Sequence, residues 1–290
     1  MNPGSLSGWL LDPYTSQFMR RALLAAILVG VLCPVVGVWV VLRRLAFLGD
    51  AMSHSSLAGV ATAYLLGASI VAGALLAGLV MGLLVAVLGA RRRLHDDAAI
   101  GVVETVLFAT GLLLIARNDN VGVDLTHFLL GQITTVDDHD LLLSGALTAL
   151  VLAAAALLGR DLLWATFDPV HARGVGVPDR LVRTVVLAMV SIAVVVSLQT
   201  VGLLMSIAIL VTPAASARLC THRVSTMTAL AVSLGVASTV GGLTLSYHLG
   251  TPPGATIALV AAAGFAVTFA VTAAPPRGGW PSLDNGYRHH

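Results

Sequence analysis

The sequence predicts an all-α integral membrane protein, a bundle of about eight or nine transmembrane helices. Of the 290 residues, 57% are hydrophobic and only 10% are charged, whereas a soluble protein carries about 25% charged residues. The mean hydropathy is +0.93. Apolar runs of roughly 20 residues, the length that a helix needs to cross a bilayer, recur along the whole chain. Valine-rich runs are assigned to helices as well, because an open sheet cannot satisfy its backbone polar groups in lipid.

The apolar runs define the predicted elements in chain order. They cover 19–42, 51–67, 70–90, 98–116, 139–159, 181–198, 200–217, 225–246 and 254–274. Very short separations at 67–70 and 198–200 leave two boundaries open, and one of these pieces can be a half-span or a re-entrant helix.

These elements make up one membrane domain over residues 19–274, with no soluble domain attached. Residues 1–18 are predicted to form an interfacial N-terminal segment, with Trp9 and Tyr14 at the level of the lipid headgroups. Residues 275–290 are predicted to be a cytoplasmic tail.

The arginines predict the orientation, because basic residues accumulate in cytoplasmic loops. The arginine clusters are separated by two spans each, so all of them can lie on the cytoplasmic side. They contain Arg43, Arg44, Arg91, Arg92, Arg93, Arg160, Arg173, Arg180, Arg183, Arg218 and Arg223. The acidic loop 117–138 is then external. Arg20 and Arg21 fit this scheme less well, because they lie at the predicted outer end of the first span.

The residue inventory excludes several functions. All sixteen basic residues are arginine, so the chain lacks the lysine of a phosphate-binding P-loop. If ATP drives this protein, another subunit binds the ATP, and the chain itself is not expected to be an enzyme. The net charge of +2, spread over short arginine clusters, gives no indication of nucleic-acid binding. Cys33 and Cys220 lie in apolar runs and are expected to be small buried packing residues.

The stretch from Arg43 to Gly59, RRLAFLGDAMSHSSLAG, carries the strongest chemical signal. Asp50 and His54 are four residues apart, so a helix places both side chains on one face. Ionisable residues inside a membrane helix are costly and usually mark a substrate or proton path. A carboxylate and an imidazole suit divalent manganese, zinc or iron. The alternative is a buried Asp–His pair that only fixes helix packing. Ser53, between the two, is a candidate pathway residue.

Other polar residues are weaker candidates. Glu104 is the only glutamate of the chain and lies in an apolar run, so it either lines the pathway or relays protons, or makes one polar contact to another helix. In the external loop, His127 and His139 lie among several aspartates. Either these side chains give the external entrance a negative charge that attracts cations, or they are ordinary solvated loop residues.

The connector between two long spans has the pattern of a short capped helix. Asp168 is a good N-cap and Pro169 suits the first turn, while Gly174 is expected to stop the helix within about two turns. A short helix lying across the cytoplasmic face with one arginine has the shape for docking another subunit. An ordinary connector is the alternative.

Taken together, these motifs resemble the permease subunits of the manganese/zinc/iron ABC importers. The matching segments are RRLAFLGDAMSHS at 43–55, DLTHFLLG at 124–131, FDPVHARGVG at 167–176, 201–217, and GTPPGA at 250–255. They keep the order of the family from about residue 20 to 270. Leu130 departs from the more usual phenylalanine, which affects no ligand.

The resemblance implies a fold similar to that of the cobalamin and siderophore permeases and a location in the bacterial plasma membrane. It implies a homodimer, a cytoplasmic ATP-binding subunit and an extracytoplasmic metal-binding solute-binding protein as partners. The substrate would be manganese or zinc, with iron as a third candidate, and there would be no permanently bound cofactor. Asp50 and His54 would be the metal ligands. The residues that couple transport to the ATPase would be Phe167, Asp168, Pro169, Ala172, Arg173 and Gly174.

Two other functions are compatible with parts of the sequence. An ion- or proton-coupled secondary carrier could use Asp50, His54 and Glu104, but such carriers usually show paired halves, which are not evident. A membrane-embedded metalloenzyme would need a fuller ligand set such as H-E-x-x-H, which the sequence lacks.

Overall fold

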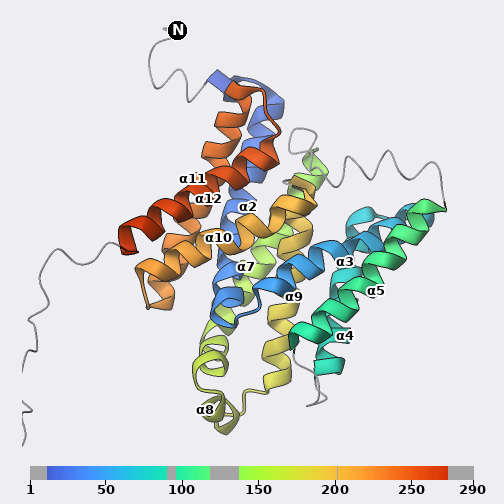
Figure 1. Ribbon diagram of the computed structural model, residues 1–290, viewed down its shortest axis with the longest axis vertical. Coiled ribbons are helices and arrows are strands. Elements are labelled where there is room, and N and C mark those ends of the chain that lie inside the picture. Colours follow the sequence, from blue (N-terminus) through green and yellow to red (C-terminus); the bar gives the residue numbers. More distant parts are fainter. Residues whose placement is uncertain (1–11, 90–95, 118–136, 201, 274–290) are drawn as a thin grey trace, which may run out of the picture.

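The computed structural model describes residues 12–89, 96–117, 137–200 and 202–273, and within these ranges it is helical with no strand. Nine long helices, a 3-10 turn and a short connector helix form the described part of the chain (Figure 1). In chain order they are η1 (Asp12–Thr15), α2 (Gln17–Leu42), α3 (Ala46–Leu65), α4 (Ile70–Gly89), α5 (Asp96–Ala116), α7 (Asp138–Phe167), α8 (Pro169–Gly174), α9 (Asp179–Thr200), α10 (Leu203–Cys220), α11 (Val224–Leu249) and α12 (Pro253–Ala273).

Seven of the described helices are long and apolar enough to cross a membrane: α2, α4, α5, α7, α9, α11 and α12. Helix α3 falls outside this set because Asp50, His54 and three serines lower its hydropathy. The apolar part of α10 within the described residues, Ser206–Cys220, is shorter than a full span. Both pack among the seven spans. The predicted multi-pass all-α bundle is therefore confirmed.

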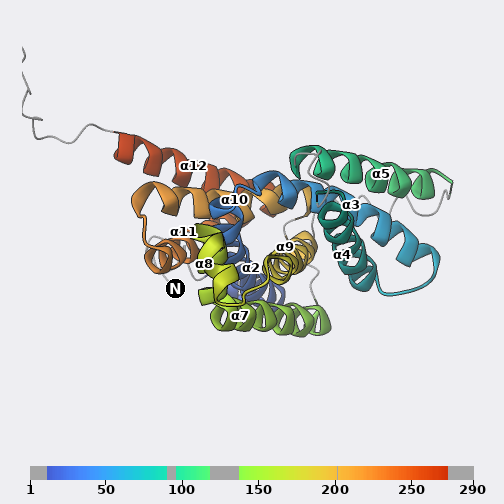
Figure 2. The same cartoon turned by 90° about the horizontal axis from the view of Figure 1, so that it is seen from below.

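Helices α2 and α9 form the centre of the bundle, and they are the most buried of the seven spans. Figure 2 shows α2 and α9 surrounded by the other helices, with α5 and α12 at opposite edges. Helices α5, α7 and α12 expose apolar side chains over most of their length. Such outward-facing apolar surface is stable in lipid or against another membrane protein.

Helix α3 packs most closely against α4 and α5, and small residues permit the close approach. Between α3 and α4, Gly59 and Gly73 face each other so closely that a Cβ atom at either would clash with the carbonyl group of the other. Between α3 and α5, a Cβ at Gly111 would lie 2.7 Å from the Ala58 nitrogen. These contacts fix α3 against its two neighbours.

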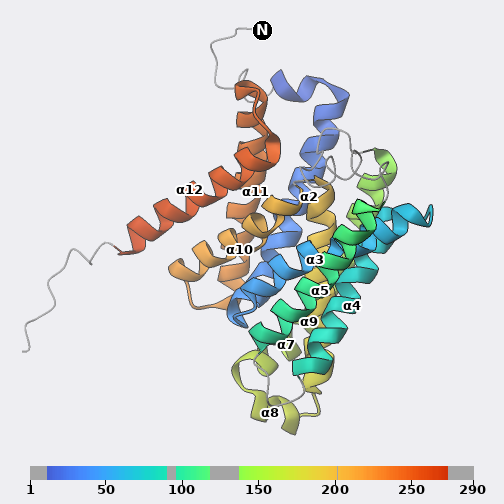
Figure 3. The same ribbon diagram turned by 45° about the vertical axis from the view of Figure 1, so that its right-hand side comes forward.

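Helix α7 is longer than the apolar run at 139–159 indicated, since it continues to Phe167. Arg160 ends the apolar run but not the helix, because its guanidinium lies over the Trp164 ring, 4.6 Å from the centroid. At the other end of α7, Asp138 pairs with Arg21 at 2.6 Å. That ion pair gives a reason for an arginine at the predicted outer end of α2. Helix α8 lies at the end of the molecule opposite to the start of α2 (Figures 1 and 3).

Several expectations are corrected by the structure or lie outside the described residues. Cys33 is buried as expected, but Cys220 is exposed because it ends α10. Helix α10 begins at Leu203 and not at residue 200, since Gly202 adopts a φ of 90°. Tyr14 contacts Thr244 through their hydroxyl oxygens at 2.6 Å. Trp9, Asp124, His127, the DLTHFLLG motif and the tail from 275 lie outside the described residues.

Candidate functional site

Asp50 and His54 lie on one face of α3, as the four-residue spacing predicts. The helix begins at Ala46, so both residues stand within regular helix. The His54 Nε2 atom is 3.5 Å from the Asp50 Oδ1 atom. Both side chains are partly exposed, 27% for His54 and 38% for Asp50. The pair is therefore accessible and is not sealed inside the core.

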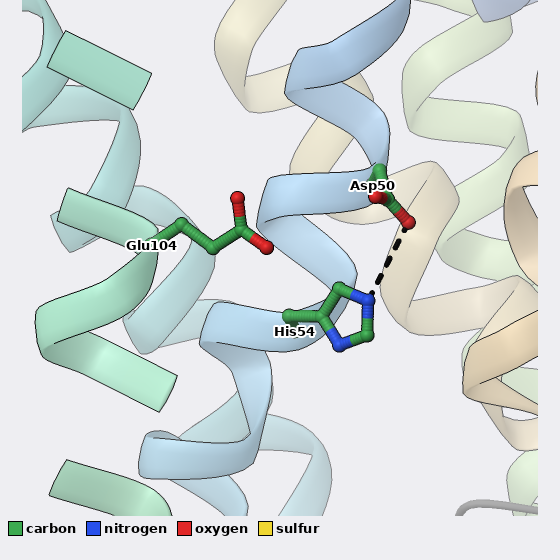
Figure 4. A group of neighbouring side chains, drawn as sticks. All are labelled: Asp50, His54 and Glu104. Atoms are coloured by element: carbon green, nitrogen blue, oxygen red, sulfur yellow. Dashed lines mark ion pairs between the residues drawn. The ribbon is translucent and has the colours of Figure 1, made fainter. Parts of the chain in front are cut away.

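Glu104 completes a group of three. It projects from α5 toward the α3 pair (Figure 4), and one ligand atom from each of Asp50, His54 and Glu104 lies within 4.8 Å of the other two. Neighbouring Val103 is buried and Gly111 touches the backbone of α3, so α5 is held close enough for the Glu104 carboxylate to reach. The sequence indicated Glu104 only as a pathway candidate. Its being the only glutamate, in an apolar run, was the available signal.

The group has the composition of a divalent-metal site. Two carboxylates balance the charge of a dication where few other polar groups surround it. The imidazole adds a nitrogen ligand, and this mixed set suits manganese, iron or zinc. The Phe108 ring stands edge-on to the His54 ring, with centroids 5.5 Å apart, which restricts the orientation of the imidazole. Three ligands from two helices leave further coordination positions for water or another group.

Ser53 contacts a different helix, α10. Its side chain is buried, and its hydroxyl donates to the Gly49 carbonyl at 3.0 Å. It also shares a hydrogen bond of 3.0 Å with the Ser206 hydroxyl on α10. Ser53 therefore joins α3 to α10, while Asp50 and His54 meet α5.

A second group of potential ligands stands at the start of α7. Ligand atoms of Asp137, His139 and Asp140 lie within 4.8 Å of one another, but Asp137 and His139 are exposed. Asp137 acts as the N-cap of α7, since its Oδ1 accepts a hydrogen bond from the Asp140 N–H at 2.7 Å. Helix capping accounts for this arrangement.

The connector α8 has the predicted cap. The Asp168 Oδ1 atom accepts a hydrogen bond from the His171 N–H at 2.9 Å, and Pro169 occupies the first turn. Gly174 is the last helical residue, but the reversal in backbone direction occurs at Gly176, with a φ of 87°. Ala172 is buried and anchors α8.

The outer surface of α8 and its flanks is apolar with one positive charge. Phe167, Val170 and Val175 are exposed by 58%, 77% and 52%, and Arg173 is exposed beside them. Exposed apolar side chains grouped around a charge are typical of a contact surface for another protein.

Known proteins with similar sequences and structures cover nearly the whole chain. The sequence profile of the ABC 3 transport family matches residues 15–272. The manganese transport system membrane protein MntC of Halalkalibacterium halodurans is 39% identical over 253 residues, which are 87% of this chain and 87% of that protein. A probable iron transport system membrane protein of Haemophilus influenzae is 32% identical over 262 residues, covering 90% of this chain and 96% of that protein.

The structural comparison agrees with the sequence comparison. The solved structure of PsaBC from Streptococcus pneumoniae in complex with Fab contains a chain with a TM-score of 0.82 and 29% identity, over 91% of this chain and 95% of that one. The likeness therefore extends to the arrangement of the helices.

Proposed function

Because this chain belongs to the ABC 3 transport family, we propose that it is the membrane-spanning permease subunit of an ATP-driven importer of a divalent transition metal. The observation that carries the proposal is the group of Asp50, His54 and Glu104, whose ligand atoms lie within 4.8 Å of one another between two helices of the membrane bundle. The metal ion is the transported substrate and not a resident cofactor.

The position of this group between α3 and α5 suits transport. Two ligands come from α3 and one from α5, so a small separation of the two helices removes a carboxylate from the ion. The remaining pair holds a dication more weakly, since one negative charge no longer balances two positive ones. A site of this kind binds the ion when the helices are close and releases it when they part.

Manganese is the substrate that the group supports best. Carboxylate oxygens suit manganese, and this site has two of them with one imidazole. The manganese and iron systems named among the relatives agree with this choice. Zinc stays a competitor, because it binds more tightly than manganese to most oxygen and nitrogen ligands.

The proposed complex contains a separate ATP-binding subunit that docks on α8. The sequence without lysine cannot supply a P-loop, and α8 presents Val170 and Arg173 to solvent. A metal-binding solute-binding protein would deliver the ion at the opposite end of the bundle.

A second copy of the chain would cover the face that α3 and α5 present. Phe108 on α5 and Phe47 on α3 are 38% and 47% exposed on these two helices. The partly exposed Asp50 and His54 lie on the same two-helix unit. Association over this face would place the metal path at the homodimer interface and supply the water-free surroundings that strengthen metal binding.

The test is ATP hydrolysis by the assembled complex of this chain, its ATP-binding subunit and its solute-binding protein, with manganese, zinc, ferrous iron or cobalt. We expect manganese to stimulate hydrolysis most and Glu104→Gln, which keeps the side-chain size, to remove the stimulation. The chain alone should hydrolyse no ATP. Metal uptake into vesicles by the chain without an ATP-binding subunit would contradict the proposal and favour a secondary carrier.

A further inference from the structure

A cavity of about 350 Å³ lies where α2 passes into α3, at the ends of α7 and α9 that adjoin α8. Its polar lining consists of Arg43, Arg44, Arg183, Asp179 and Thr166. The rest of the wall is aliphatic and includes side chains of α3, α4 and α5. Three guanidinium groups against one carboxylate give this cavity a positive balance, and its volume falls within the range of roughly 300–1,000 Å³ typical of ligand sites.

Arg43 is held in place but not neutralised. Its Nε donates a hydrogen bond to the Thr166 hydroxyl at 3.1 Å, and that hydroxyl donates to the Leu162 carbonyl. The Arg43 Nη2 atom is buried and has no hydrogen-bond partner among the residues that the structure describes. Burial lowers the pKa of the Arg43 guanidinium, Asp179 acts in the opposite direction, and Arg183 lowers it further. An arginine stays protonated in proteins, so the buried charge lacks a full counterion.

The start of α3 lies at the same place, and its first turn contains no acidic side chain. Helix α3 begins at Ala46, and its N-cap position holds Leu45, whose side chain makes no capping hydrogen bond. The first N–H groups of a helix carry partial positive charge and bind anions. Leu45 lines the cavity beside Arg44, which adopts a φ of 58° in the turn between α2 and α3.

We infer that this cavity binds a phosphate group, either that of an anionic phospholipid or free phosphate. The guanidinium groups of Arg43 and Arg44 and the start of α3 provide the donors that a phosphate accepts. The aliphatic wall favours the phospholipid, and basic pockets between transmembrane helices on the cytoplasmic side are typical sites for lipid headgroups. The arginine distribution predicts this end of the bundle to be cytoplasmic.

The bound phosphate would connect two parts of the protein that the proposed transport cycle uses. On one side is the start of α3, the helix that carries Asp50 and His54. On the other are the last turn of α7 and the first turn of α9, which flank α8. The inference does not depend on which metal the protein transports.

The experiment measures the thermal unfolding midpoint of the full-length chain in a neutral detergent. The probes are phosphatidylglycerol, phosphatidylcholine, and inorganic phosphate against chloride at equal ionic strength. A ligand that binds only the folded state raises the midpoint by an amount that grows with the logarithm of its concentration relative to its Kd. We expect phosphatidylglycerol to raise it and phosphatidylcholine to raise it much less.

Matched variants locate the effect. In Arg43→Gln the phosphatidylglycerol concentration needed for a given shift should rise about tenfold or more, since a charged hydrogen-bond partner is lost. Arg223→Gln removes the same charge from an exposed position outside the cavity and should respond as the wild type does. If Arg43→Gln does not fold, Arg44→Asn serves the same comparison, because asparagine tolerates a positive φ.

The two sources give different results. A shift with inorganic phosphate that also depends on Arg43 assigns the site to the free anion, and a shift with phosphatidylglycerol alone assigns it to the lipid. An unchanged midpoint with both probes, or equal shifts in Arg43→Gln and the wild type, would overturn the inference and leave a water-filled cavity.

Discussion

Gly111→Ala should damage metal transport without touching a ligand. Gly111 faces the backbone of α3 one turn beyond His54, where an added Cβ would lie 2.7 Å from the Ala58 nitrogen and 2.9 Å from the Leu57 carbonyl carbon. Non-bonded heavy atoms in contact are separated by about 3.5 Å or more, so α5 must withdraw from α3 by about 0.8 Å. Because the obstructing atoms are backbone, a change of side-chain rotamer cannot relieve the contact.

A displacement of this size exceeds what a metal site tolerates. Metal–ligand distances are defined to within about 0.2 Å, and Glu104 lies on the same helix as Gly111, two turns away. We expect the metal concentration for half-maximal uptake to rise about tenfold or more. The overpacking in Gly111→Ala costs about 1–3 kcal/mol of folding free energy. Alanine is more stable than glycine inside a helix by about 0.5–1 kcal/mol, which offsets part of this cost.

The matched control is Gly101→Ala on the same helix, where an added Cβ meets no atom within 4 Å. It should transport normally and be slightly more stable, by about 0.5–1 kcal/mol. The assay is manganese uptake against metal concentration in vesicles, normalised to folded protein, together with the unfolding midpoint of each variant. If folded Gly111→Ala takes up manganese with the concentration dependence of the wild type, the α3–α5 contact does not position Glu104.

Two further outcomes are expected. Arg173→Glu should leave the bundle folded but weaken binding of the ATP-binding subunit, because it reverses a charge on the exposed surface of α8; a complex that assembles and transports normally would contradict this. Asp168→Ala should reduce metal-stimulated ATP hydrolysis, since the lost cap costs about 1 kcal/mol, whereas Asp168→Asn should retain it; equal activity of the two variants would show that the cap is dispensable.

The helices were largely predictable because each is a local feature of the sequence. A long apolar run must be a helix in lipid, and most runs end within a few residues of the observed helices. The discrepancies have local causes that hydropathy does not contain. Helix α7 continues past Arg160, whose guanidinium lies against Trp164, and α10 starts late because Gly202 adopts a positive φ.

The candidate site was also predictable only where it depends on local sequence. Asp50 and His54 share a face because of their spacing within one helix, which the sequence shows directly. Glu104 reaches them only because α5 packs against α3 through Gly111, and neither helix alone contains information about that contact. The sequence therefore indicated that Glu104 is unusual but not which residues it joins. Ser53, although next to His54 in the chain, points to α10 instead.

The proposal is tested most directly by manganese uptake per folded transporter in variants of the three ligands. Asp50→Asn and Glu104→Gln keep side-chain size and remove charge, while His54→Ala removes the nitrogen ligand. Each should abolish nearly all uptake with the bundle still folded, and the double variant of Asp50 and His54 should be hardly worse than either single one, since residues of one site are not additive.

A pair that only stabilises helix packing would behave differently, because breaking it lowers the amount of folded protein first. In that case uptake falls only in proportion to the folded protein that is lost. Normalised uptake near the wild-type value in any of the three single variants would contradict a metal site at Asp50, His54 and Glu104.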